Sequence, residues 1–135
     1  MSLRIKLIAP LALSAALLLA PTAGAATVAA HSGALSATLH GGTHHPIENK
    51  NWWITVTATL NGRPVRAHAF YQFLFSGQVV STQYVTYKKN YMFTGHFRDN
   101  LVFPPRAVGY PLTVRVVVQA GGRTVYLPYA VQVVK

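Results

Sequence analysis

The amino-acid sequence predicts an all-β protein, folded as a two-sheet antiparallel sandwich of seven strands. Apolar side chains recur at every second position in one segment after another, which is the period of a half-buried strand. Pairs of glycine, proline and asparagine separate these segments at short intervals, as turns do between strands. After the leucine- and alanine-rich start of the chain, no segment has the period of a helix. Two facing sheets are a common way to bury one face of so many strands.

The clearest strand is expected at residues 111–118, which read Pro-Leu-Thr-Val-Arg-Val-Val-Val. One face of this segment carries the apolar side chains of Leu112, Val114, Val116 and Val118. Val117 makes the opposite face partly apolar as well. A strand that is apolar on both faces is typical of a sheet centre, so we expect the other strands to pair with it or cover it.

The amino terminus is predicted to be a secretory signal peptide covering residues 1–25. Arg4 and Lys6 precede an apolar run at residues 7–20, and the small residues 23–25 supply a cleavage site. The apolar run is shorter than the roughly 20 residues that a spanning helix needs. We therefore expect a secreted, extracellular or envelope-associated protein with no transmembrane span after cleavage.

The charge of the chain is strongly positive, with 12 Lys and Arg residues against the two acids Glu48 and Asp99. In an exported protein, this imbalance favours an anionic envelope polymer as partner, without specific binding to nucleic acid. A solubilising charge with no dedicated partner is the alternative. The absence of cysteine excludes disulfides, thiol nucleophiles and thiolate metal sites, so stability must come from the apolar core.

Residues 26–45 are expected to be a flexible leader that contains one weak strand. Val28 is the only sizeable apolar side chain in residues 26–33, so this stretch has little to bury. The alternation of Leu35, Ala37 and Leu39 with polar residues predicts a short first strand. The sandwich itself is expected at residues 46–135.

Three further strands are predicted before residue 90. Residues 52–60 alternate cleanly and end at the turn signal Asn-Gly, residues 61–62. The next strand, at 65–75, should place Phe75 inward and Leu74 outward. A weaker strand is expected at 78–85, after Ser-Gly at positions 76–77.

Two more strands flank the central one. In the strand predicted at 92–103, Asp99 falls on the apolar side. Either a bulge rotates this carboxylate to solvent, which we favour, or an arginine such as Arg66 or Arg106 pairs with it. The last strand, at 124–134, should run antiparallel to the central strand, with Pro128 confining it to a sheet edge or a bulge.

Several runs resemble bacterial immunoglobulin-like and fibronectin-type-III-like export domains. They are Trp-Trp-Ile-Thr-Val-Thr-Ala at 52–58, Gly-Arg-Pro-Val at 62–65, Tyr-Gln-Phe-Leu-Phe-Ser-Gly-Gln-Val-Val at 71–80, and Gly-Tyr-Pro-Leu-Thr-Val-Arg-Val at 109–116. The resemblance is strongest to small secreted proteins of high-GC Gram-positive bacteria. It implies a seven-stranded immunoglobulin-like β-sandwich over residues 46–135 that acts as a binding or spacer module, with Tyr110 as a structural tyrosine corner.

A basic and aromatic loop is the first candidate for ligand binding. Lys88 and Lys89 lie among Tyr84, Tyr87 and Tyr91, and cations beside flat rings suit an acidic polymer or glycan. The alternative is a solvated hairpin tip with the tyrosines packed beneath it.

A histidine loop is the second candidate site. His40, His44 and His45 could bind zinc, copper or nickel, although Glu48 is the only carboxylate nearby in sequence. The favoured interpretation is a solvated loop whose histidines become charged at mildly acidic pH. No cofactor is expected.

The sequence does not predict an enzyme, because two carboxylates and no nucleophile-elbow motif offer little catalytic chemistry. We expect a secreted, non-catalytic binding or accessory module at the cell envelope. The alternative is a structural spacer, or a module that binds a protein partner through an exposed strand edge.

Overall fold

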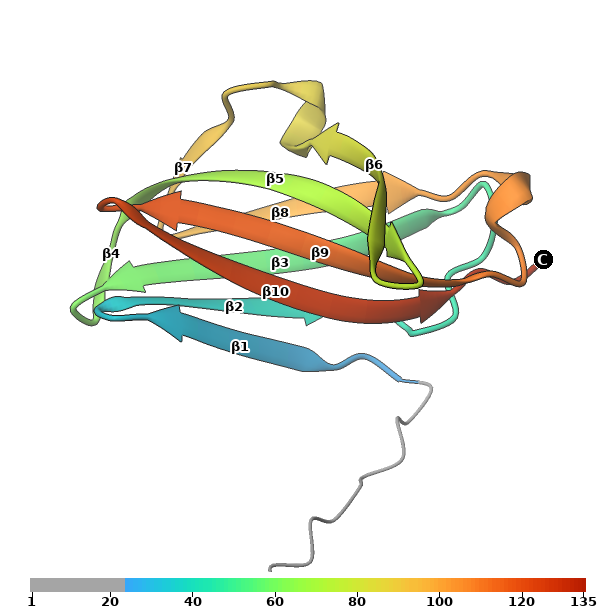
Figure 1. The fold of residues 1–135 in the computed structure, drawn as a ribbon, viewed down its shortest axis with the longest axis horizontal. Helices are drawn as coiled ribbons and strands as arrows, with labels where there is room; N and C mark the ends of the chain where they lie inside the picture. Colours follow the sequence, from blue (N-terminus) through green and yellow to red (C-terminus); the bar gives the residue numbers. More distant parts are fainter. Residues whose placement is uncertain (1–23) are drawn as a thin grey trace, which may run out of the picture.

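The computed structural model describes residues 24–135, so the predicted signal peptide lies outside the described residues apart from Gly24 and Ala25. The described chain forms two five-stranded antiparallel sheets that face each other (Figure 1). Residues 24–135 contain no α-helix, and none of their segments is a helix long and apolar enough to cross a bilayer. The expected all-β architecture with two antiparallel sheets is confirmed.

The first sheet has the strand order β1-β2-β3-β8, with the short β4 paired to the end of β3. Its strands are β1 (Thr27–Ser32), β2 (Leu35–Gly41), β3 (Asn51–Leu60), β4 (Arg63–Pro64) and β8 (His96–Val102). The second sheet has the order β10-β9-β5-β6, with β7 paired to β5. Its strands are β5 (Arg66–Phe75), β6 (Gln78–Tyr84), β7 (Met92–Thr94), β9 (Pro111–Ala120) and β10 (Arg123–Gln132). Two short 3-10 turns, η1 (Val85–Tyr87) and η2 (Pro105–Ala107), complete the chain.

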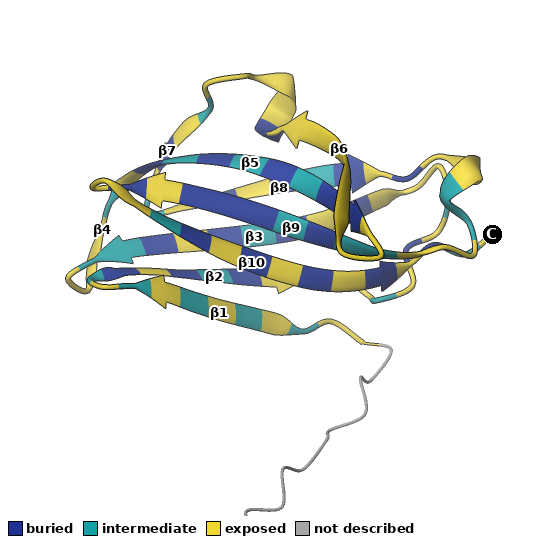
Figure 2. Cartoon of the chain, in the orientation of Figure 1, coloured by how far each residue is buried: buried dark blue, intermediate teal, exposed yellow. Residues whose placement is uncertain are grey.

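Strand β9 is central, as its sequence predicts, because it lies between β10 and β5. Val114, Val116 and Val118 are completely buried against the first sheet. Val117 on the opposite face is also buried, which accounts for the apolar character of both faces. Strand β9 is accordingly drawn mostly in the colours of buried and half-buried residues (Figure 2). The expected edge position of β10 is confirmed too, and Pro128 lies within that edge strand.

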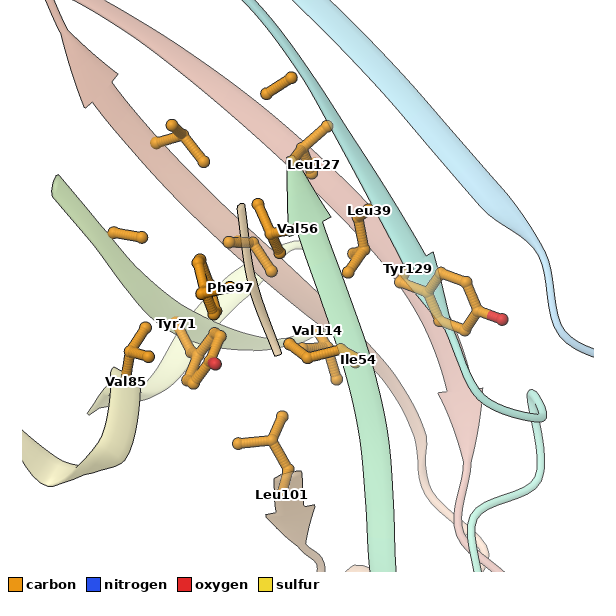
Figure 3. Close-up of a cluster of buried hydrophobic side chains, with 14 of the residues drawn as sticks. Leu39, Ile54, Val56, Tyr71, Val85, Phe97, Leu101, Val114, Leu127 and Tyr129 are labelled. Carbon is orange, nitrogen blue, oxygen red and sulfur yellow. The ribbon is translucent and has the colours of Figure 1, made fainter. Parts of the chain in front are cut away.

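The core lies between the two sheets. Figure 3 shows Leu39, Ile54 and Val56 of the first sheet meeting side chains of the second. The side chains of the second sheet labelled there are Tyr71, Val114, Leu127 and Tyr129. The inward residues that alternation predicted on β2 and β3 are buried in this core, Leu60 at the end of β3 being partly exposed.

The sandwich begins earlier than expected. Residues that we expected to form a flexible leader contain β1, which pairs with β2 along its whole length. Ala26, Val28 and Ala30 pack against the core. Main-chain hydrogen bonding does not depend on large side chains, so an open strand edge can recruit a segment with little apolar surface of its own. The boundary predicted at residue 46 is therefore wrong, because β1 and β2 belong to the first sheet.

The strand predicted at 92–103 is divided between the two sheets. β7 pairs with β5, whereas β8 pairs with β3, and Gly95 separates them with a φ of +77°. Glycine adopts this left-handed conformation without strain, so the chain can pass from one sheet to the other there. This division, the short β4 and the added β1 give the described chain ten strand segments where seven strands were predicted.

The end of β5 differs from the expected alternation. The pairing of β5 with β6 shifts between Phe73 and Leu74. Leu74 is 9% exposed although it was predicted to face outward, while Phe75, at the open end of the groove, is 38% exposed. The extra residue of this bulge is Val80 of β6, and β5 keeps its register with β9, so Phe75 stays on the face of Phe73 and lines the space between the sheets, as predicted. Leu74 lies on the predicted outer face but is buried there, which alternation did not indicate.

Candidate binding surface between β6 and β8

The two lateral sides of the sandwich differ. On one side, β1 and β10 lie against each other and close the gap between the sheets (Figure 1). Tyr129 of β10 reinforces this side, because its hydroxyl accepts a hydrogen bond from the Ala26 amide (3.0 Å) and donates one to the Gly42 carbonyl (2.5 Å). Its ring stacks on His44 at 4.4 Å. This side leaves no opening at Tyr129, which is itself buried.

The opposite side is open. β6 and β8 are the outer strands there, and neither pairs with a further strand of the described chain along its outer edge. Every residue of β6 is exposed, on both faces of the strand (Figure 2). Ser81 and Gln83 stand opposite the inward-facing Phe73 and Tyr71, so their side chains face the space between the sheets.

An apolar groove of about 490 Å³ lies on this open side. The lining residues come from β5, β6, β8, the η2 turn and the start of β9. They are Phe73, Phe75, Val80, Ser81, Gln83, Val102, Phe103, Pro104, Arg106, Ala107, Tyr110 and Leu112. Two pairs of aromatic rings that meet edge to face stiffen the floor of the groove. The ring centroids of Phe73 and Phe103 lie 6.1 Å apart, and those of Phe75 and Tyr110 lie 5.9 Å apart. Arg106 is the only charged residue in the lining.

A smaller, polar pocket of about 90 Å³ adjoins this groove. Its lining includes Tyr84, Thr86, Tyr87 and Asp99, and it shares Gln83 and Val102 with the apolar groove. The two hollows therefore form one continuous surface between β6 and β8, apolar at the η2 end and polar at the η1 end.

Asp99 lies at the inner end of the polar pocket and is 8% exposed. Its Oδ2 accepts hydrogen bonds from the Tyr71 hydroxyl (2.8 Å) and the Thr86 amide (3.1 Å). The prediction that a bulge or an arginine accommodates this carboxylate is wrong, because neutral donors from β5 and η1 hold it. Burial, and then the charge of Asp99, raise the pKa of Tyr71, so this hydroxyl keeps its proton and remains a donor.

The lysine turn, residues 85–91, connects the polar pocket to the surface. Tyr87 is 91% exposed, and Lys88 and Lys89 are exposed beside it. Tyr84 is exposed as well, and with Tyr87 it lines the polar pocket. The structure thus brings together four of the five residues predicted to bind a ligand.

The fifth residue, Tyr91, is partly buried and packs against the core. Its ring is stacked on that of Phe93, with ring centroids 6.4 Å apart, and meets the ring of Phe97 edge to face, with centroids 5.5 Å apart. Burial raises its pKa, with a further contribution from the charge of Asp99. Tyr91 therefore holds the end of the lysine turn against the core. His68 of β5 adds a second support, because its Nε2 lies 3.3 Å from the Lys89 carbonyl oxygen.

The three histidines of the predicted metal loop have separate roles. His40 Nδ1 lies 3.0 Å from the Thr27 hydroxyl, between β2 and β1. His44 Nδ1 lies 2.6 Å from the Ala130 carbonyl oxygen, while its ring stacks on Tyr129. His45 is exposed. Within residues 24–135, no three His, Cys, Asp or Glu side chains converge on a common point suited to a metal ion.

Tyr110 does not have the position implied by the resemblance. A tyrosine corner holds its hydroxyl against the main chain, but Tyr110 is 54% exposed and its ring forms a wall of the apolar groove. The tyrosine that bonds the main chain of distant segments is Tyr129. The apolar groove itself was not foreseen. Its signal in the sequence is that Phe75 and Tyr110 each stand beside a turn at the end of a strand.

No family model, curated protein or solved structure matches this chain. The surface between β6 and β8 is therefore the feature of the molecule that bears most directly on its function.

Proposed function

We propose that this protein is a secreted, non-catalytic binding module of the cell envelope that recognises an anionic partner. The observation that carries the proposal is the lysine turn, where Tyr87, Lys88 and Lys89 are exposed together beside the open side of the sandwich. Adjacent ammonium groups and an exposed ring can contact phosphate, sulfate or carboxylate groups of a polymer and stack on its backbone.

The charge distribution supports this proposal. Of the 12 Lys and Arg residues, only Arg4 and Lys6 lie outside the described chain, so ten belong to the folded part. Asp99 is buried, which leaves Glu48 as the only acidic side chain near the surface of residues 24–135. An anionic polymer therefore meets a positive potential over most of the molecule, and repulsive contacts are few.

The strand order supports an immunoglobulin-like assignment. If β2, β3 and β8 are taken as strands A, B and E, they share one sheet, as in immunoglobulin-like domains. β5, β9 and β10 then correspond to strands C, F and G of the other sheet, with β6 beside C. Domains with this arrangement often serve as binding modules, although the fold alone does not specify a ligand.

The test is retention on immobilised polyphosphate in a salt gradient. The double variant Lys88→Glu, Lys89→Glu should bind about tenfold more weakly than wild type at 0.1 M salt and elute earlier, because it loses two phosphate contacts. The control variant Lys50→Glu, Lys135→Glu changes the net charge equally at other exposed positions. It should retain most of the binding.

Equal losses in the two double variants would mean that net charge acts without a site, which contradicts the proposal. Retention that does not change with salt would also contradict it. That result would favour the second candidate, a module that binds a protein partner through the unpaired edge of β6, because main-chain hydrogen bonds to an added strand respond little to salt. The exposure of every β6 residue is the observation that supports this candidate.

A further inference from the structure

We infer that the apolar groove between β6 and β8 binds a single-chain amphiphile, an acyl chain that carries an anionic head group. This inference concerns a second site and does not depend on the lysine turn. It rests on the shape of the groove, the chemistry of its lining and the placement of charge at its two ends.

The groove gathers exposed apolar side chains that a protein surface normally disperses. Phe75, Val80, Val102 and Tyr110 are each between 38% and 59% exposed, and all four line this one groove. Contiguous exposed apolar surface of this kind commonly marks a binding site. The volume of about 490 Å³ lies in the range of small-molecule pockets, which is roughly 300–1,000 Å³.

The groove is bounded by strands and is suited to an extended ligand. Its β6 wall runs from Val80 to Gln83, about 10 Å at the usual rise per residue. Val102 of β8 forms part of the facing wall, and the rings of Phe73 and Phe103 lie on the floor. A linear hydrocarbon chain laid between the strands would bury apolar surface along its length, which is the main source of binding energy for such a ligand.

The charges at the ends of the groove set the direction of the ligand. Arg106, in the η2 turn, is the only charged lining residue and is exposed, so it can pair with an anionic head group. At the other end, the adjoining polar pocket contains Asp99. A head group inside that pocket would be repelled by the buried carboxylate, and Lys88 and Lys89, which are exposed on the lysine turn, do not line the pocket. The head group is therefore expected at Arg106 and the end of the chain towards Gln83.

The test is calorimetric titration of the purified protein with decanoate and with decanol, which share a chain length but differ in charge. Wild type should bind decanoate at least tenfold more tightly than decanol. Arg106→Gln should lose about tenfold in decanoate affinity and keep its decanol affinity, because only the charged contact is removed. Arg106 lies on an exposed turn, so this variant should fold normally.

A matched control is Arg123→Gln, which removes the same charge from an exposed position that does not line the groove. It should bind decanoate as wild type does. The variant Lys88→Glu, Lys89→Glu should also keep decanoate binding, so this inference can fail or succeed separately from the proposed function. In NMR spectra, decanoate should shift the Val80 and Val102 methyl resonances and the Arg106 side-chain N–H resonance.

Three results would overturn the inference. One is the absence of decanoate binding at millimolar concentration below micelle formation. The second is equal decanoate affinity in wild type and Arg106→Gln. The third is tighter binding of 2-naphthoate than of decanoate, which would show that the groove selects a ring instead of a chain.

Discussion

Asp99 and Tyr71 form a hydrogen bond between the two sheets, since Asp99 belongs to β8 and Tyr71 to β5. The Thr86 amide of η1 adds a second donor to the same carboxylate oxygen. A buried carboxylate that loses a donor is left poorly solvated, so this contact stabilises the fold more than an exposed hydrogen bond would. It also fixes the inner wall of the polar pocket.

Removing the Tyr71 hydroxyl tests this contact. Tyr71→Phe should lower the free energy of unfolding by about 1.5–3 kcal/mol at neutral pH, the usual value for a hydrogen bond to a charged group. Urea denaturation followed by tryptophan fluorescence measures the change. Tyr87→Phe, at a hydroxyl-bearing ring that is almost fully exposed, is the control and should change the stability by less than about 0.5 kcal/mol.

The pH dependence of this difference gives an independent check. The pKa of Tyr71 is raised above its ordinary value of 10.0, so the folded state holds this proton more tightly than the unfolded state does. The resulting stabilisation is complete below pH 10 and is lost as the pH rises towards the folded-state pKa. The stability difference between wild type and Tyr71→Phe should therefore shrink above pH 10. A constant difference up to pH 11.5 would contradict the assignment.

At the scale of elements, Gly95 is the residue at which the chain leaves β7 in the second sheet and enters β8 in the first. Its φ of +77° is strained for any residue with a side chain, and an added Cβ would lie 3.2 Å from the Cβ of Pro64. The short strand β4, which contains Pro64, is paired to the end of β3 and restricts this crossing point from outside. Both the backbone conformation and the neighbouring strand therefore favour glycine.

The variant Gly95→Ala should lower the free energy of unfolding by about 1–3 kcal/mol, from left-handed strain and crowding together. Gly62→Ala is a matched control, because Gly62 has a φ of +76° and no atom within 4 Å of the added Cβ. Gly62→Ala introduces the backbone strain without the crowding, so it should lower the free energy of unfolding by less than Gly95→Ala does. Thermal unfolding of the two variants measures the difference, and equal losses would show that Pro64 does not restrict Gly95.

The alternation of apolar and polar residues is sufficient to predict the strands that keep the same face towards the core along their whole length. β3 and β9 are such elements, because β-branched and aromatic residues recur at every second position and the buried ones match the prediction. The burial of Leu74 could not be predicted, because alternation does not show which side chains cover the outer face of a strand, and the bulge at Val80 depends on the partner strand. β1 was missed for a similar reason, because an edge supplied by β2 gives it a partner.

The candidate site was predictable only where it is local in sequence. Lys88, Lys89 and Tyr87 lie in one turn, so their shared exposure follows from the turn itself. The apolar groove combines residues from positions 73 to 112, which only the packing of the two sheets brings together. Asp99 was misplaced because its donors, Tyr71 and Thr86, are distant in sequence and not charged.

At the scale of the whole molecule, the sandwich has one closed and one open side. β10 and β6 are the outer strands of the same sheet, but β10 is covered by β1 whereas β6 is exposed on both faces. Strands with little buried surface open locally at a lower free energy than the core does. The open side should therefore be the more dynamic part of the molecule.

Amide hydrogen exchange can compare these strands directly. Among amides that donate within the sheet, those of β9 should exchange only through global unfolding, and those of β6 at least about 100-fold faster. β10 is the internal control, because it is also an outer strand, and its amides should exchange more slowly than those of β6. Protection in β6 equal to that in β9 would show that the open side is as rigid as the core.

The burial of Asp99 also has a consequence for how copies of this protein meet one another. An uncovered strand such as β6 is a template on which a second copy could add its own strand, the first step towards aggregation. With Asp99 buried, the described chain has ten Lys and Arg residues but only Glu48 as an acidic side chain near its surface, so neighbouring copies carry a strong charge of the same sign. Mutual repulsion keeps such copies apart at low ionic strength. The positive charge that attracts an anionic partner therefore also protects β6 from pairing with a strand of another copy.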